Sequence, residues 1–133
     1  MSETKSTFET LEVWIKSRKT RNKISKLSKC FSPEEKYKTV DQMIRASRSV
    51  TANIAQGYGR YNYQENIEYC RQARGSLYEF IDHIYVALDE NYIDNKIQRN
   101  IKLEILEVLG LLNGYLKYLS ERKKNSEVVL VNI

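Results

Sequence analysis

Apolar residues recur along the chain at steps of three and four, which is the spacing that places side chains on one face of an α-helix. Three breaks divide this pattern, and each break carries residues that are typical of helix ends. The pattern therefore predicts four long helices joined by short connections. A chain of this kind favours an all-α fold, namely an antiparallel up-down-up-down four-helix bundle.

The first predicted helix, residues 8–31, combines a weak apolar stripe with a basic remainder. Its stripe consists of Val13, Ser17, Thr20, Ile24, Leu27 and Phe31, with Trp14 at the margin. Ser17 and Thr20 stand where apolar residues are expected. Basic residues away from the stripe predict a basic outer face. The candidate contacts to a polyanion are Lys16, Arg18, Lys19, Arg21, Lys23, Lys26 and Lys29.

The second helix is expected to begin at Pro33, because Ser32, Pro33 and Glu35 form a helix-start pattern. It is expected to end at Gly57 and Gly59, since glycine adopts the left-handed conformation of a helix end without penalty. Its predicted inward positions are Tyr37, Val40, Ile44, Ser47, Val50 and Ile54.

Side chains that can cap a helix precede the third and fourth segments. Asn62, with Glu65 three residues later, predicts the start of the third helix, and Asp94 or Asn95 predicts that of the fourth. The inward positions are Ile67, Cys70, Ala73, Leu77, Ile81, Ile84 and Leu88 in the third helix and Ile97, Ile101, Ile105, Val108, Leu112, Tyr115 and Leu119 in the fourth. Further leucines widen the apolar side of the fourth helix, which predicts contacts with more than one neighbour.

The domain prediction is a single bundle at residues 8–124, after a flexible start at 1–7. The tail at 125–133 has a strand-like composition but no partner strand, which favours disorder over docking on a neighbouring subunit.

The composition agrees with this reading. One proline in 133 residues suits long helices, since an interior proline costs about 3 kcal/mol. No apolar run approaches a membrane span and the first residues lack the apolar core of a signal peptide, so we expect a cytoplasmic protein.

Candidate catalytic and metal-binding chemistry is sparse. Cys30 and Cys70 lack the spacing of a metal or redox motif, and His83 is the single histidine. No Ser/His/Asp or Cys/His arrangement stands out. We therefore predict no enzyme, no metal and no cofactor.

Charge is distributed unevenly along the chain, whose net charge is +5. Residues 1–31 contain eight Lys or Arg against three Asp or Glu, whereas residues 61–93 contain two against six. Such asymmetry predicts either self-association between opposite faces or a localised site for a polyanion.

Two glycines in "NIAQGYGR", residues 53–60, raise the question of a phosphate-binding loop. Such a loop follows a strand and has a longer glycine pattern, so a helix end and tight turn are favoured. The segments "SVTANIAQGYGR" (49–60), "ARGSLYEFIDHIYVALDENYI" (73–93) and "FETLEVWIKS" (8–17) together resemble the four-helix bundle protein family. Its members include the 23S rRNA-intervening sequence proteins of bacteria.

The resemblance implies a small cytosolic all-α protein that assembles as a homopentamer. A distant branch consists of accessory proteins of diversity-generating retroelements, which bind a reverse transcriptase and nucleic acid. The resemblance supplies no catalytic residue.

The motif positions are Trp14, Asn53, Gly57, Gly59, Arg60, Arg74, Gly75 and Ser76. At Gln56 the chain departs from the glutamate usual in the family, which puts an ion pair there in doubt. Gly75 predicts a close approach by another helix, since glycine inside a helix costs about 1 kcal/mol. Arg74 is expected to donate an ion pair within or between subunits.

Tyrosines cluster around the turn between the second and third helices, with arginines nearby. The set is Tyr58, Tyr61, Tyr63 and Tyr69, with Arg60 and Arg71. Aromatic and arginine side chains can stack single-stranded bases, but they are also enriched at subunit interfaces. We favour the interface.

Two functional hypotheses follow. The first is a homo-oligomeric helical protein that binds RNA or a nucleoprotein, such as a reverse transcriptase, through the basic face of the first helix. The alternative is an oligomeric scaffold whose basic helix meets an acidic protein partner.

Overall fold

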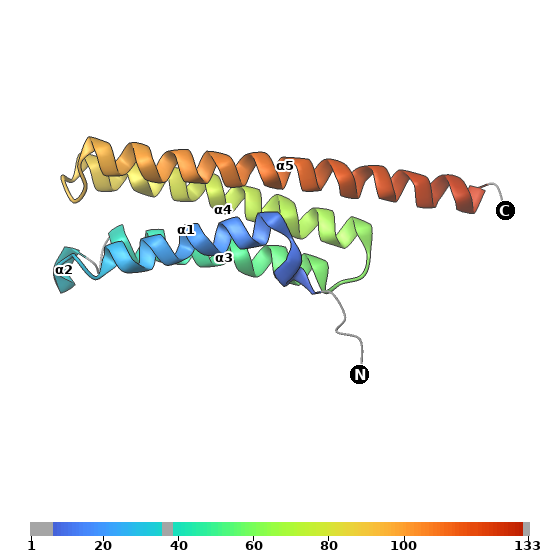
Figure 1. The fold of residues 1–133 in the computed structure, drawn as a ribbon, viewed down its shortest axis with the longest axis horizontal. Helices are drawn as coiled ribbons and strands as arrows, with labels where there is room; N and C mark the ends of the chain where they lie inside the picture. The colour runs from blue at the N-terminus through green and yellow to red at the C-terminus, as the bar shows by residue number, and fades with distance from the viewer. Residues whose placement is uncertain (1–6, 36–38, 132–133) are drawn as a thin grey trace.

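The computed structural model describes residues 7–35 and 39–131 and confirms an all-α four-helix bundle (Figure 1). The described residues contain no strand. The elements are a 3-10 turn η1 (Phe8–Thr10), α1 (Glu12–Ser28), the single turn α2 (Pro33–Glu35), α3 (Asp41–Tyr58), α4 (Tyr63–Asp89) and α5 (Asn95–Val131). The chain direction alternates from one long helix to the next, as Figure 1 shows.

The four long helices pack as the corners of a square. α3 packs against α1 and α4, and α5 packs against α4 and α1. The helices α1 and α4 therefore stand at opposite corners, and their outer faces point away from each other. The prediction that the fourth helix contacts more than one neighbour is confirmed.

The predicted inward positions make the core wherever the structure describes them. The largest fully buried side chains include Phe80, Leu77 and Ile84 of α4, Met43 and Ile54 of α3, Ile105 and Leu112 of α5, and Ile24 of α1. Leu27, Phe31, Ile81, Leu88, Ile97 and Tyr115 are partly buried against this core. Helical periodicity thus located most of the core.

Ser17 and Thr20 are buried on α1, as the stripe predicted. The Ser17 hydroxyl donates to the carbonyl oxygen of Val13 at 2.6 Å, and that of Thr20 donates to the carbonyl of Lys16 at 3.2 Å. Each buried hydroxyl is therefore satisfied within its own helix.

The second predicted helix begins at Pro33 as predicted, with α2 (Pro33–Glu35), and residues 36–38 lie outside the described range. A π-helical turn at Thr39 and Val40 leads into α3 at Asp41. Tyr37, a predicted inward position, lies outside the described residues. The remaining inward positions, Val40, Ile44, Ser47, Val50 and Ile54, are all buried.

The predicted helix end and tight turn at the glycines of α3 are confirmed, since α3 ends at Tyr58 and α4 begins at Tyr63, but the predicted left-handed glycine is wrong. Gly57 lies inside the helix, and Gly59 caps it with a right-handed φ of −72°. The left-handed residue of this turn is Tyr61, with φ 54°. Gly57 is required because α4 comes close: an added Cβ would lie 2.6 Å from Oδ1 of Asn66 and 3.0 Å from Cβ of Tyr69.

The predicted close approach at Gly75 is also wrong, since an added Cβ there would meet no atom within 4 Å. This glycine lies on the exposed face of α4. The tight helix contact predicted from sequence therefore exists at Gly57 instead.

The predicted caps are confirmed. Oδ1 of Asn62 accepts from the backbone N–H of Glu65 at 2.9 Å, and Oδ1 of Asp94 accepts from that of Ile97 at 2.8 Å. α5 continues to Val131, past the expected end of the bundle at residue 124, so the structure gives 125–131 helical geometry where the composition favoured disorder. The end of α5 projects beyond the other helices (Figure 1).

Candidate nucleic-acid interface

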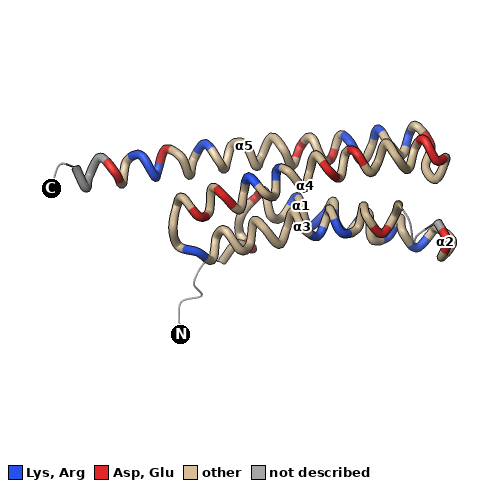
Figure 2. The backbone as a smooth tube through the Cα atoms, turned by 180° about the vertical axis from the view of Figure 1, so that it is seen from behind, with Lys and Arg blue, Asp and Glu red and all other residues tan. Residues whose placement is uncertain are grey.

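Figure 2 shows several basic residues close together on α1. Of the seven basic residues singled out on this helix, two bind carboxylates of α5. Nζ of Lys16 lies 2.9 Å from Oε2 of Glu107, and Nζ of Lys23 lies 3.0 Å from Oε2 of Glu104. Lys16 also lies 3.9 Å from Oε1 of Glu104, a side chain that is only 14% exposed. These two lysines therefore join α1 to α5 rather than offering free charge to a ligand.

Two arginines of α1 interact with other neighbours. Nη1 of Arg21 donates to Oγ1 of Thr51 on α3 at 3.1 Å. The guanidinium of exposed Arg18 lies 5.7 Å from the centre of the Trp14 ring, within the range of a cation–π contact. Neither contact neutralises the positive charge.

The remaining candidates on α1 are exposed lysines that make no ion pair with any described residue. With Arg18 they form a strip, interrupted by Asn22, on the side of the helix that faces away from the bundle. We call this strip the α1 outer face; it comprises Arg18, Lys19, Lys26 and Lys29. Four of the seven predicted contacts thus lie on this face without an ion pair to a described residue, and Arg21 keeps its charge beside it.

A groove of about 350 Å³ lies beside this face, between α1 and α3. We call it the α1–α3 groove; it is lined by Arg21, Asn22, Ser25, Ile44 and Arg48. No carboxylate lines it, and the exposed Arg48 side chain has no hydrogen bond or ion pair within the described part of the chain. Two guanidinium groups from different helices therefore border a recess that suits an oxyanion.

Sequence reasoning missed Arg48 because α3 has no dense basic run. One turn away, Arg45 pairs with Asp41 at 3.3 Å, which leaves Arg48 as the unneutralised arginine of α3. The helical spacing could have identified Arg48, since Arg45 and Arg48 are three residues apart and therefore lie on the same exposed side of α3.

The acidic surface lies at the opposite corner of the bundle. The exposed carboxylates of α4 are Glu65, Glu68, Glu79, Asp82 and Asp89. A polyanion is therefore attracted to the α1 corner and repelled from the α4 corner, which gives it one preferred side of the protein.

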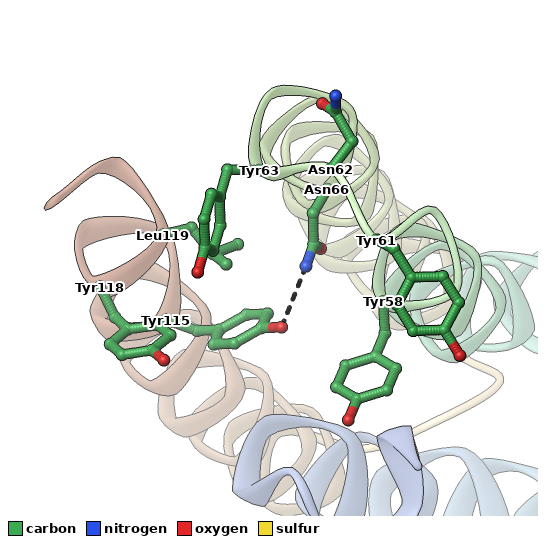
Figure 3. A pocket seen from close by; sticks show the side chains of 8 residues that line it. All are labelled: Tyr58, Tyr61, Asn62, Tyr63, Asn66, Tyr115, Tyr118 and Leu119. Atoms are coloured by element: carbon green, nitrogen blue, oxygen red, sulfur yellow. Dashed lines mark hydrogen bonds between the residues drawn. The ribbon is translucent and has the colours of Figure 1, made fainter. Parts of the chain in front are cut away.

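A second recess, of about 290 Å³, lies where α3 turns into α4 beside α5. We call it the tyrosine pocket; it is lined by Tyr58, Tyr61, Asn62, Tyr63, Asn66, Tyr115, Tyr118 and Leu119 (Figure 3). The rings of Tyr115 and Tyr118 stack with centres 6.2 Å apart and planes inclined by 13°. Nδ2 of Asn66 donates to the Tyr115 hydroxyl at 3.2 Å.

Three of the four clustered tyrosines line this pocket, while Tyr69 does not. Its hydroxyl instead accepts from Nη2 of Arg60 at 2.6 Å. Sequence reasoning missed Tyr115 and Tyr118, which lie about fifty residues further along the chain and reach the pocket only because α5 packs against α4.

The motif residues make mostly structural contacts. Trp14 packs edge-on against Phe8, with ring centres 5.0 Å apart. Nδ2 of Asn53 donates to the Ser49 carbonyl at 2.9 Å, and the Ser49 hydroxyl lies 2.8 Å from that of Ser76 on α4. The Ser49–Ser76 contact joins α3 to α4, and the Asn53 bond lies within α3.

Arg74 was predicted to form an ion pair, but its described partner is neutral. Nη1 of Arg74 donates to Oδ1 of Asn113 at 3.2 Å, which links α4 to α5.

The described residues contain no group of three or more His, Cys, Asp or Glu that could hold a metal ion. Burial raises the pKa of the Cys70 thiol to about 12, whereas Cys30 is exposed. None of the helices described here has the length and apolarity needed to cross a membrane.

Comparison with known proteins agrees with this fold. The family described as 23S rRNA-intervening sequence protein matches residues 9–114. A solved structure from Bacteroides thetaiotaomicron VPI-5482, a protein with unknown function from the S23 ribosomal protein family, superposes with a TM-score of 0.74 at 23% identity, covering 79% of this chain and 95% of that one. The curated proteins include no similar sequence. The chain belongs to the 23S rRNA-intervening sequence protein family.

Proposed function

We propose that this chain is a non-enzymatic protein of the cytoplasm that forms a homo-oligomer, a pentamer, and binds RNA or a nucleoprotein through the α1 outer face. The observation that supports RNA binding is the set of four exposed cations on α1 with no carboxylate partner among the described residues. Arg48 extends this surface onto α3.

Binding at this surface is expected to be electrostatic. Lys and Arg that neutralise backbone phosphates displace condensed counterions, so affinity falls steeply with salt. The surface has few groups that could read base edges, and we therefore expect little preference for sequence.

Assembly into a homo-oligomer would raise the overall affinity for RNA, because each subunit contributes one weak site. A single strip of four cations binds modestly, but a ring presents one strip per subunit to the same RNA.

The test measures fluorescence anisotropy of a labelled structured RNA with a quadruple charge-reversal variant. The variant carries Glu in place of Arg18, Lys19, Lys26 and Lys29. Its matched control carries Glu in place of Lys96, Arg99, Lys117 and Lys124, four exposed bases of α5 that make no ion pair with described residues.

Both variants change the net charge equally, so only the position of the charge differs. We expect the α1 variant to lose at least tenfold in affinity and the α5 variant to lose clearly less. Equal losses would mean that net charge alone drives binding, which would refute a site on α1. Light scattering on the same samples gives the oligomeric state.

The second candidate is an oligomeric scaffold with an acidic protein partner. Its support is the same basic strip, because an acidic protein surface can replace phosphates there. Unrelated RNA should displace a nucleic-acid ligand from the α1 outer face but leave a protein complex largely intact.

A further inference from the structure

The tyrosine pocket has the form of a small ligand site. Tyr63, Tyr115 and Tyr118 lie on one side of the recess, and Tyr58 and Tyr61 lie across from them (Figure 3). The Asn66–Tyr115 hydrogen bond and the stacking of Tyr115 on Tyr118 hold part of the wall in place. A site that is formed before binding avoids the entropy cost of ordering its side chains.

The size of the pocket limits its occupant. A volume of about 290 Å³ lies at the small end of the range for ligand pockets, which is about 300–1,000 Å³. A helix of a second subunit needs a long groove rather than one short recess. One planar ring with a small substituent suits this space.

The chemistry of the lining suits a nucleobase. Aromatic faces stack bases of any kind, and tyrosine hydroxyls can donate to or accept from base edges. Burial raises the pKa of Tyr115, so its hydroxyl keeps its proton at neutral pH. No carboxylate lines the pocket, so nothing in it repels an anion.

The Arg122 side chain lies beside the tyrosine pocket. The guanidinium of Arg122 lies 5.8 Å from the centre of the Tyr118 ring. The interaction with the Tyr63 side chain raises the pKa of Arg122. Arginine held in this way is suited to a phosphate beside the stacked base.

We infer that the tyrosine pocket binds one nucleobase, with its phosphate at Arg122. The ligand is either a free mononucleotide or an unpaired base of an RNA strand. The RNA case rests on the proposed function and adds to it a site for unpaired bases. The free nucleotide does not depend on that function.

The experiment titrates the full chain with AMP, UMP and a ten-nucleotide single-stranded RNA by calorimetry. Tyr118→Leu removes a ring that is 49% exposed, so the core stays intact. The matched control is Tyr78→Leu on α4, a ring that is 60% exposed and lies outside the pocket. Circular dichroism checks the fold, and Tyr63→Leu replaces the first variant if that one does not fold.

Saturable binding of AMP or UMP is expected, weakened roughly tenfold or more by Tyr118→Leu and unchanged by Tyr78→Leu. Arg122→Gln should weaken AMP but not adenosine, which lacks the phosphate. Absence of saturable mononucleotide binding, together with an RNA affinity that Tyr118→Leu does not change, would overturn the inference.

Further measurements distinguish a free nucleotide from an RNA base, and either of these from a second subunit, as the occupant of the pocket. Loss of RNA affinity in the α1 charge-reversal variant with retained AMP binding would support the pocket and the α1 outer face as separate sites. AMP binding with RNA affinity unaffected by Tyr118→Leu would identify a free nucleotide as the ligand. A changed oligomer mass in Tyr118→Leu, with no change in nucleotide binding, would make the pocket a subunit contact and refute the inference.

Discussion

The helices at opposite corners of the bundle, α1 and α4, are built in opposite ways. α4 buries large apolar side chains, among them Leu77, Phe80 and Ile84, and exposes carboxylates. α1 buries hydroxyls at Ser17 and Thr20 and exposes cations. The two helices therefore differ in how much of their buried surface is apolar.

Apolar burial holds α4, whereas polar contacts assist α1. The Lys16 and Lys23 pairs and the Arg21–Thr51 hydrogen bond connect α1 to both of its neighbours. α1 places hydroxyls at two core positions and exposes four cations that pair with no carboxylate among the described residues. This is why we propose RNA binding at the α1 outer face rather than at the acidic face of α4.

The largest expected effect tests the apolar side of this contrast. Phe80→Ala removes a fully buried ring of α4 and should lower the free energy of unfolding by about 3–5 kcal/mol. Ser17→Ala on α1 should change it by less than about 1 kcal/mol, because the lost hydroxyl bonds only within its own helix. Denaturant titration measures both, and a comparable loss for Ser17→Ala would contradict the contrast.

A smaller effect compares two helical glycines, Gly57, which α4 approaches closely, and Gly75, which has open space around it. Gly57→Ala should destabilise the protein by about 1–3 kcal/mol, because its Cβ would meet the backbone oxygen of Asn66 at 3.1 Å and Cβ of Tyr69 at 3.0 Å. Gly75→Ala is the control and should stabilise by up to about 1 kcal/mol, since it improves helix propensity in open space. Thermal melts compare the two, and a stabilising Gly57→Ala would show that α4 does not approach there.

The ion pairs of α1 should contribute less. Replacing Lys16 and Lys23 together by Gln is expected to cost about 1 kcal/mol, because both pairs are partly exposed and screened. The matched double variant at Lys19 and Lys26 should leave stability nearly unchanged. If the second pair costs as much as the first, the division between paired and available cations is wrong.

The smallest effect concerns the two thiols. At pH 8 a thiol reagent should label Cys30 quickly and Cys70 only on unfolding, since the thiolate is the reactive form and Cys70 has a pKa of about 12. The unfolded thiol loses its proton near pH 9.0, before the folded one does, so the contribution of Cys70 to stability falls between pH 9.0 and about 12. Rapid labelling of both thiols in the native state would place Cys70 outside the core.

Helical periodicity predicted the fold because buried positions in a helical bundle recur every three to four residues, as the apolar residues of this sequence do. The caps at Asn62 and Asp94 were predicted from their capping side chains, which lie beside the helix ends. Periodicity did not predict the π-helical geometry of Thr39 and Val40 at the entry to α3, where the apolar spacing continues through Val40. The local sequence pattern thus predicted which face of each helix is buried better than it predicted where each helix begins and ends.

Contacts between distant segments could not be predicted. Lys16 and Lys23 were placed with the other bases of α1 because Glu104 and Glu107 meet them only through the packing of α5. The choice between Gly57 and Gly75 likewise depends on which helix comes close, and no local signal carries that information. Basic character was therefore readable from the sequence, while the availability of each charge was not.

The most direct test of the central claim is the salt dependence of RNA affinity. Wild type, the α1 charge-reversal variant and the α5 control are compared between about 50 and 200 mM salt, the range over which phosphate contacts weaken strongly. If all four cations contact phosphate, the slope of log affinity against log salt should fall by about 3 in the α1 variant and remain near the wild-type value in the control, since each contact contributes about 0.7–0.9. An unchanged slope in the α1 variant would show that RNA does not bind at the α1 outer face.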